Sequence, residues 1–193
     1  PVTTGSIPSS AATTTAPAAE ASAPTAVEAN LPDQIGPETL RRAATSGDAR
    51  AAFEVALRFA EGKTVPADLA KAVTWYTVAA EKGLAPAQYR LAVAFEKGLG
   101  VPRDAEKART WYTAAAEQGN VRSMHNLGVL YANSRDMAKA VPWFQKAADY
   151  GLRDSQFNLG IINALGSGVK QDLAVSYKWF ALAARQGDAE AEK

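Results

Sequence analysis

Hydrophobic and small side chains recur along this sequence with one long period. The segment AKAVTWYTVAAEKG at residues 70–83 returns, with substitutions, at residues 106–119, 138–151 and 174–187. All tryptophans of the chain lie in these segments, spaced 36, 32 and 36 residues apart: Trp75, Trp111, Trp143 and Trp179. A fourfold recurrence at a nearly fixed spacing indicates a repeat protein.

A different pattern upstream of each segment predicts a first helix. It consists of a ring, an aliphatic residue two positions later, then a small residue, and a second ring four positions after the aliphatic one. This spacing places the apolar groups on one broad helix face. The first rings are Phe53, Tyr89, His125 and Phe157, and the aliphatic residues are Val55, Leu91, Leu127 and Leu159. The small residues are Ala56, Ala92, Gly128 and Gly160. The second rings are Phe59, Phe95 and Tyr131, and Asn163 stands in place of the fourth.

A loop follows each first helix and ends on an aspartate. The loops read EGKTVPAD, KGLGVPRD, ANSRD and LGSGVKQD. Counted from the last ring position of the first helix to the aspartate, the third connection is four residues shorter, which accounts for the 32-residue spacing. Glycine suits the left-handed conformation that ends helices. Aspartate is a favoured N-cap. The sequence therefore predicts capping roles for Asp68, Asp104, Asp136 and Asp172.

The tryptophan segments predict the second helix of each pair. Large rings beside small alanines, repeated at helical spacing, form a stripe that is buried against a neighbour. Pro142 lies inside the third of these helices and predicts a local distortion.

The pattern divides the chain into a tail and a repeat domain. Residues 1–36 hold five prolines, three acidic residues and no aromatic residue, Lys or Arg, so we expect a disordered linker there, or else an expression remnant. Residues 37–193 form the repeat domain, in these parts: a capping helix at 37–47, repeats at 48–83, 84–119, 120–151 and 152–187, and the start of a further helix at 188–193.

Composition narrows the functional classes. The formal net charge is +1, with mixed signs, which does not favour binding to nucleic acid. The sequence has no cysteine and one histidine, so disulfides, thiolate metal sites and histidine clusters are excluded. No apolar run is long enough to span a membrane. Because the chain begins PVTTGSIPSS, we expect it to be part of a longer protein or a processed product.

The segment LAVAFEKGLGVPRDAEKARTWYTAAAEQG resembles the Sel1-like repeat, a relative of the tetratricopeptide repeat. The resemblance covers about residues 37–193, with local departures at His125, Asn163 and the short third loop. It implies an all-α, right-handed solenoid of about nine helices that acts as a non-catalytic scaffold for protein partners.

A narrower similarity is carried by DSQFNLGI, YKWFALAARQGDAEAEK and the TTGSIP tail. These segments resemble the periplasmic region of the PodJ group of alphaproteobacterial polar localization factors. That resemblance implies a periplasmic location, a membrane-anchored parent protein, a role in cell polarity and a neighbouring peptidoglycan-binding region. The alternatives are a periplasmic regulator that binds a sensor kinase, and a cell-wall hydrolase or β-lactamase-like enzyme. The cysteines typical of the latter group are missing.

The conspicuous side chains favour structural roles over chemistry. His125 stands where the other repeats have a ring, so we predict a packed ring rather than a catalytic base. The tryptophans favour packing over sugar or base stacking, and the aspartates are too far apart to converge on a cation. The glycine loops lack the G-x-x-x-x-G-K-[ST] pattern of phosphate loops. We therefore predict no catalytic residue, no metal and no cofactor.

Partner recognition is then expected at positions that differ between repeats. In stacked helical hairpins the first helices line the concave side, which suits an extended peptide or a partner helix. Leu130 and Ile162 are also candidates for packing beneath the next repeat. The predicted binding stripe is Glu54, Arg58, Arg90, Asn126, Leu130, Asn158 and Ile162.

Overall fold

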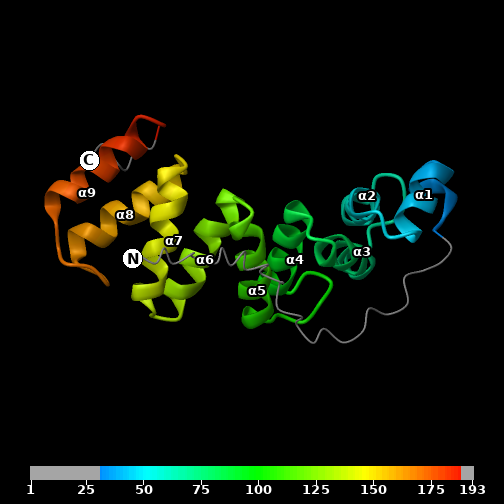
Figure 1. Ribbon diagram of the computed structural model, residues 1–193, viewed down its shortest axis with the longest axis horizontal. Coiled ribbons are helices and arrows are strands. Elements are labelled where there is room, and N and C mark those ends of the chain that lie inside the picture. Colours follow the sequence, from blue (N-terminus) through cyan, green and yellow to red (C-terminus); the bar gives the residue numbers. More distant parts are fainter. Residues whose placement is uncertain (1–30, 188–193) are drawn as a thin grey trace, which may run out of the picture.

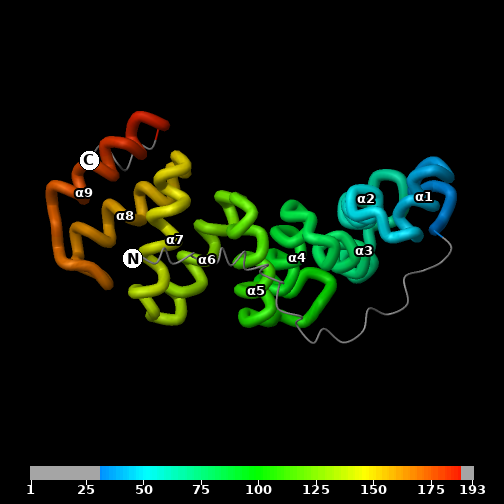
Figure 2. Tube along the Cα trace, in the orientation of Figure 1, coloured from blue at the N-terminus to red at the C-terminus, as the bar shows by residue number. Residues whose placement is uncertain are grey.

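The computed structural model describes residues 31–187 and shows an elongated stack of helices (Figures 1 and 2). Within this range there are nine α-helices, one short 3-10 helix and no strand. The predicted all-α repeat solenoid is confirmed. The elements are η1 Asp33–Ile35, α1 Glu38–Thr45, α2 Ala49–Glu61, α3 Leu69–Glu81, α4 Ala85–Lys97, α5 Ala105–Glu117, α6 Val121–Asn133, α7 Met137–Asp149, α8 Arg153–Leu165 and α9 Leu173–Ala184.

The helices pair as four antiparallel hairpins, which are α2–α3, α4–α5, α6–α7 and α8–α9. Each hairpin packs on the next through its second helix, so that α3 contacts α4, α5 contacts α6 and α7 contacts α8 (Figure 1). The core therefore extends along the stack as a chain of neighbouring clusters. This arrangement is typical of repeat proteins, in which each unit is stabilised mainly by its neighbours.

Ring pairs hold each hairpin together. The first ring of each first helix meets the ring that follows tryptophan on the second helix, with centroids 5.5–6.0 Å apart. In the last two repeats a glycine on the first helix lies directly beneath this second ring. A Cβ atom at Gly128 would lie 2.7 Å from Phe144, and one at Gly160 would lie 2.5 Å from Phe180. The small residue thus sets how closely the two helices approach.

The predicted aspartates begin the second helices. The carboxylate of Asp68 accepts a hydrogen bond from the backbone N–H of Lys71, and Asp104 accepts two such bonds. Asp136 and Asp172 make the same contact in the last two repeats. Each carboxylate satisfies backbone donors that a helix start leaves without a partner, which is worth about 1 kcal/mol.

The short third loop bends through an arginine rather than a glycine. Arg135 has φ 61°, the left-handed conformation that elsewhere in these loops is taken by glycines such as Gly98 and Gly166. This conformation destabilises an L-residue by about 1–2 kcal/mol. Glycine avoids this steric penalty, but it loses more backbone entropy on folding, so replacing the arginine with glycine removes only part of the cost.

We therefore expect Arg135→Gly to raise the free energy of unfolding by about 0.5–1 kcal/mol. Urea denaturation followed by circular dichroism would measure the change. Arg122→Gly, at an exposed position in the first turn of α6, serves as the opposite control, because glycine there is expected to lower the free energy of unfolding by up to about 0.5 kcal/mol. A loss of stability in Arg135→Gly would contradict the strain argument.

The N-terminal boundary of the ordered domain differs from the prediction. Residues 31–36 were expected within the disordered linker, but they fold against the first repeat, where Leu31 is 6% exposed and Ile35 is fully buried. These two apolar side chains complete the core beside α1 and α2. Their burial offsets the entropy lost on ordering this short segment, which the average composition of residues 1–36 did not indicate. The predictions for residues 1–30 and 188–193 fall outside the described residues.

Helix α7 passes through Pro142 without a break. The proline is exposed, so its ring faces away from the core. Proline supplies no N–H to the carbonyl one turn earlier, yet the predicted distortion does not interrupt the helix.

Candidate partner-binding surface

The predicted binding stripe lies on the first helices α2, α4, α6 and α8. Some of its residues are buried, some are bonded within the fold, and some are accessible. Leu130 and Ile162 are 9% and 5% exposed and belong to the hydrophobic core. Their inclusion in the binding stripe is therefore corrected, because packing beneath the neighbouring repeat removes both from the surface.

Glu54 and Arg58 serve the N-terminal end of the stack. Nε of Arg58 lies 2.9 Å from a carboxylate oxygen of Glu54, and its Nη1 donates to the carbonyl of Ile35 at 2.6 Å. This guanidinium thus ties α2 to the segment before α1. Partner binding by either residue stays a prediction, and it would compete with this internal contact.

Asn126 belongs to a polar network that joins three helices. Its side-chain amide donates to the hydroxyl oxygen of Tyr112 at 2.8 Å, and that hydroxyl donates to Glu96 at 2.6 Å. Burial and the bond to the Glu96 carboxylate raise the pKa of Tyr112 well above its ordinary value. The phenol therefore stays neutral, and it fixes Glu96 of α4 and Asn126 of α6 at the seam between repeats.

The hydrogen bond between Glu96 and Tyr112 was not predicted from the sequence, although Tyr112 was expected as a packed ring. A signal was present, because Glu96 replaces the alanine that the other repeats carry at the same position: Ala60, Ala132 and Ala164. A lone acidic residue in an otherwise small, apolar slot indicates a local polar partner.

Arg90 and Asn158 complete the accessible part of the stripe. Arg90 is exposed on α4, and Asn158 is partly exposed on α8, with Asn126 between them on α6. We call Arg90, Asn126 and Asn158 the Arg90–Asn158 surface. Its guanidinium and two amides can donate hydrogen bonds to carbonyl or carboxylate oxygens of a partner.

His125 occupies its ring slot as a packed side chain. Its ring meets Phe144 edge to face at 5.7 Å, and its Nδ1 lies 2.8 Å from Oγ of the buried Ser155. Burial lowers the pKa of His125, while nearby Asp154 acts in the opposite direction. The geometry joins α6 to α8 and offers no accessible nucleophile beside the imidazole, since Ser155 is fully buried.

The lowered pKa of His125 predicts acid sensitivity. As the pH drops below about 6.5, the unfolded chain binds a proton at this residue before the folded chain does. The free energy of unfolding therefore decreases as the pH is lowered, until the pH passes below the lower pKa of the folded state. Unfolding free energies measured in urea from pH 7.5 to pH 5 would test this. Because the sequence has a single histidine, His125→Phe is expected to flatten the profile in this window. An unchanged profile in the variant would contradict the assignment.

The tryptophans pack rather than line a cleft. Trp75 and Trp179 are 2% and 5% exposed, and Trp111 and Trp143 are partly buried against the second cluster. The ammonium of Lys146 lies over the ring of Trp143, 4.3 Å from the ring centre, and covers part of that face.

Two kinds of feature are missing from the part of the chain that the structure describes. Residues 31–187 contain no group of three or more side chains suited to holding a metal ion. None of their helices combines the length and apolarity that crossing a membrane requires.

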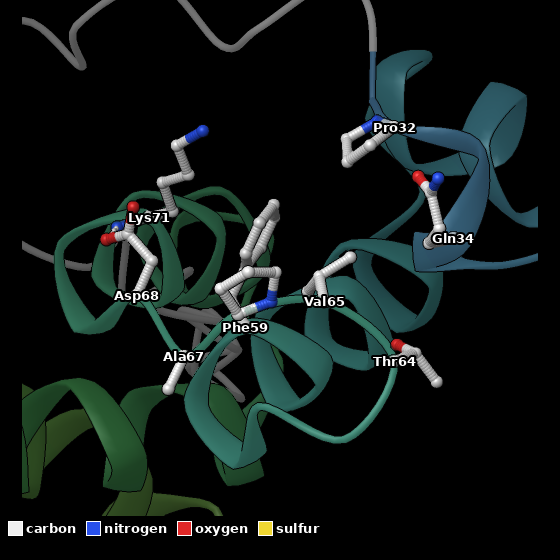
Figure 3. A pocket seen from close by; sticks show the side chains of 9 residues that line it. Pro32, Gln34, Phe59, Thr64, Val65, Ala67, Asp68 and Lys71 are labelled. Atoms are coloured by element: carbon white, nitrogen blue, oxygen red, sulfur yellow. Dashed lines mark hydrogen bonds between the residues drawn. The ribbon is translucent and has the colours of Figure 1, made fainter.

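A cavity of about 500 Å³ lies at the N-terminal end and was not predicted. In Figure 3, Pro32 and Gln34 lie across from Phe59, Val65 and Thr64, while Asp68 and Lys71 border the other side. Asp68 caps α3, and the Lys71 ammonium stacks on the Phe59 ring at 5.6 Å. Both charged groups at this rim are thus engaged in the fold.

The repeat unit itself is that of a known family. The Sel1 repeat model matches residues 49–84, 85–120, 121–151 and 153–188. The chain belongs to the Sel1 repeat family. The matched segments begin one residue after the predicted repeats, and their four hairpins are those described above.

Solved structures of Sel1 repeat proteins resemble this one. The crystal structure of c5321, a protective antigen present in uropathogenic Escherichia coli strains and displaying an SLR fold, is 34% identical, with a TM-score of 0.75, and covers 84% of this chain. A Sel1 repeat protein from Oxalobacter formigenes is 29% identical, with a TM-score of 0.71 and 79% coverage. The chain spans 35% and 64% of the lengths of these two proteins.

No curated protein matches the sequence. The comparisons therefore support the Sel1 family and give no support to the narrower resemblance to polar localization factors.

Proposed function

We propose that this Sel1 repeat domain is a non-catalytic scaffold that binds a protein partner through the Arg90–Asn158 surface. Sel1 repeats generally mediate protein–protein interactions. The observation that supports the proposal is that repeated and variable side chains occupy different places in the structure. Residues that recur in every repeat are used in caps and ring packing, whereas the accessible first-helix positions differ from repeat to repeat.

The chemistry of this surface favours a partner rich in exposed oxygen acceptors. Arg90 supplies a planar, permanently charged donor, and Asn126 and Asn158 supply amides at the same position of the next two repeats. An extended peptide presents backbone carbonyls at regular intervals. An acidic extended segment would therefore match both the charge and the repeated geometry.

We extend the proposal to the setting implied by the sequence resemblance. The domain would act in the periplasm as part of a membrane-anchored organiser of the cell pole, near a peptidoglycan-binding region. Binding the outer domain of a sensor kinase is the second candidate. Both settings use the same surface and differ in the partner captured.

Capture of a defined partner would test the surface. Periplasmic extract from the source organism would be passed over the wild-type chain, Arg90→Glu and Asn158→Arg, and bound proteins identified by mass spectrometry. Lys146→Glu is the matched control, because it reverses a charge on the second helix α7 instead. We expect both surface variants, but not the control, to lose the same partner. Equal capture by all four proteins would refute the surface.

The enzyme alternative has its own test. Incubation of the chain with nitrocefin and with purified peptidoglycan should give no turnover above a heat-denatured sample. Measurable hydrolysis by the folded chain would replace the scaffold with the cell-wall enzyme that the sequence left as an alternative.

A further inference from the structure

Large apolar side chains are exposed on α9, at the C-terminal end of the described stack. Tyr177 is 76% exposed and Leu173 is 67% exposed. They lie four residues apart, so they share one face of the helix. Ile161 of the paired helix α8 is 38% exposed. Grouped large apolar side chains on a protein surface mark an interaction site more often than isolated ones do.

The counterparts of Tyr177 in earlier repeats contact the following repeat. Val73 is 8% exposed and packs in the same cluster as Phe95 of α4. Arg109 places its guanidinium 5.9 Å from the ring centre of Tyr131 of α6. In the second repeat this position therefore meets the ring near the end of the next first helix, and in the first repeat it packs in the same cluster as that ring.

The counterparts of Leu173 contact the loop of the following repeat. At Gly100, a Cβ atom would lie 2.3 Å from the carbonyl oxygen of Leu69. At Gly168, it would lie 2.6 Å from Cβ of Met137. The backbone of a G-x-G loop thus rests directly on the first residue of the preceding second helix, and only glycine leaves room for this approach.

We propose that the exposed face of α9 binds a further helical hairpin of Sel1 type, packed as α4–α5 packs on α3. The hairpin would carry a ring near the end of its first helix, to meet Tyr177, and a G-x-G loop, to rest on Leu173. The exposed face of α9 does not include any residue of the Arg90–Asn158 surface, so this inference does not depend on the proposed function.

A second copy of this chain does not present such a hairpin at its N-terminal end. The loop of its first repeat carries Thr64 where the G-x-G loops have their second glycine. The neighbouring cavity is bordered by Pro32 and Gln34, which lie across from Phe59 (Figure 3). The branched Thr64 side chain prevents the close approach that Gly100 allows. Head-to-tail contacts would also propagate into filaments rather than close.

The test inserts a copy of residues 84–119 between Gly187 and Asp188 of the full chain. In its native place this hairpin packs on Leu69 and Val73, which correspond to Leu173 and Tyr177. The matched control is the same insertion with the copied Gly100 changed to threonine, the residue that the first repeat carries at this position. Hydrogen exchange of the α9 amides and sedimentation of the unmodified chain are measured.

We expect the inserted hairpin to slow exchange in α9 by about tenfold or more, since a repeat is stabilised by its neighbours. The threonine control should lose most of this protection, and the unmodified chain should sediment as a monomer. Unprotected α9 beside a folded insertion would overturn the proposal, as would equal protection by both insertions. So would self-association of the unmodified chain that Tyr177→Arg abolishes.

Discussion

Replacing Trp75 with alanine is expected to lower the free energy of unfolding by about 3–5 kcal/mol, the range for removing a large buried aromatic side chain. Trp75 is 2% exposed and lies in the cluster that joins the first two repeats. The substitution therefore leaves a cavity where hairpin α2–α3 meets α4. Because each repeat depends on its neighbours, the loss is expected to spread to both adjoining helices.

Trp143→Ala is the matched control, because it removes the same side chain from the same repeat position. Trp143 is only partly buried, and the ammonium of Lys146 lies over its ring. We expect a loss of about 1–2 kcal/mol, in keeping with the smaller apolar area withdrawn from water. Urea midpoints measured for both variants, with hydrogen exchange resolved by helix, give the comparison. Equal losses would show that repeat position, rather than burial, determines the contribution of the indole.

The order of the helices could be predicted because the sequence features that form them are repeated in each unit. Ring spacing, the Ala pair and the aspartate cap each have a local physical cause, and four copies make each pattern visible in one sequence. The same logic predicted that His125 packs as a ring, because its role is set by the slot and not by its own chemistry.

The parts that could not be predicted depend on contacts between repeats. Gln88 donates to the carbonyl of Ala80 and accepts from Gln118, and Gln156 does the same with Ala148 and Gln186. These buried amides join three successive helix ends, but the helical period alone does not say which polar side chains meet. Their paired appearance, 30 residues apart in two repeats, was the available signal.

The binding stripe was only partly predictable for a related reason. Spacing places Leu130 and Asn126 on the same side of α6, yet one is buried and the other reaches the surface. Whether a position on the edge of an apolar face is covered depends on how closely the next hairpin approaches. That approach depends on close contacts between repeats, such as Gly168 in the loop after α8, where an added Cβ atom would lie 2.6 Å from Cβ of Met137 at the start of α7.

Gly100→Val is expected to lower the free energy of unfolding by about 2–5 kcal/mol. Two effects add, namely about 1–2 kcal/mol for a left-handed L-residue and about 1–3 kcal/mol for overpacking a close contact. Gly100 has φ 74°, and a Cβ atom there would lie 2.3 Å from the carbonyl oxygen and 2.4 Å from the carbonyl carbon of Leu69. Backbone atoms cannot rotate aside, so the loop must lift from α3.

Gly119→Ala separates these two effects. Gly119 has φ 85°, but nothing lies within 4 Å of an added Cβ atom, so only the conformational cost of about 1–2 kcal/mol remains. If Gly100→Val lost no more than Gly119→Ala in urea denaturation, the loop would not bear on the preceding repeat. A larger loss in Gly100→Val, accompanied by faster exchange in both α3 and α5, is expected because the glycine contact couples one hairpin to the next. The same coupling underlies the hairpin-binding face inferred for α9.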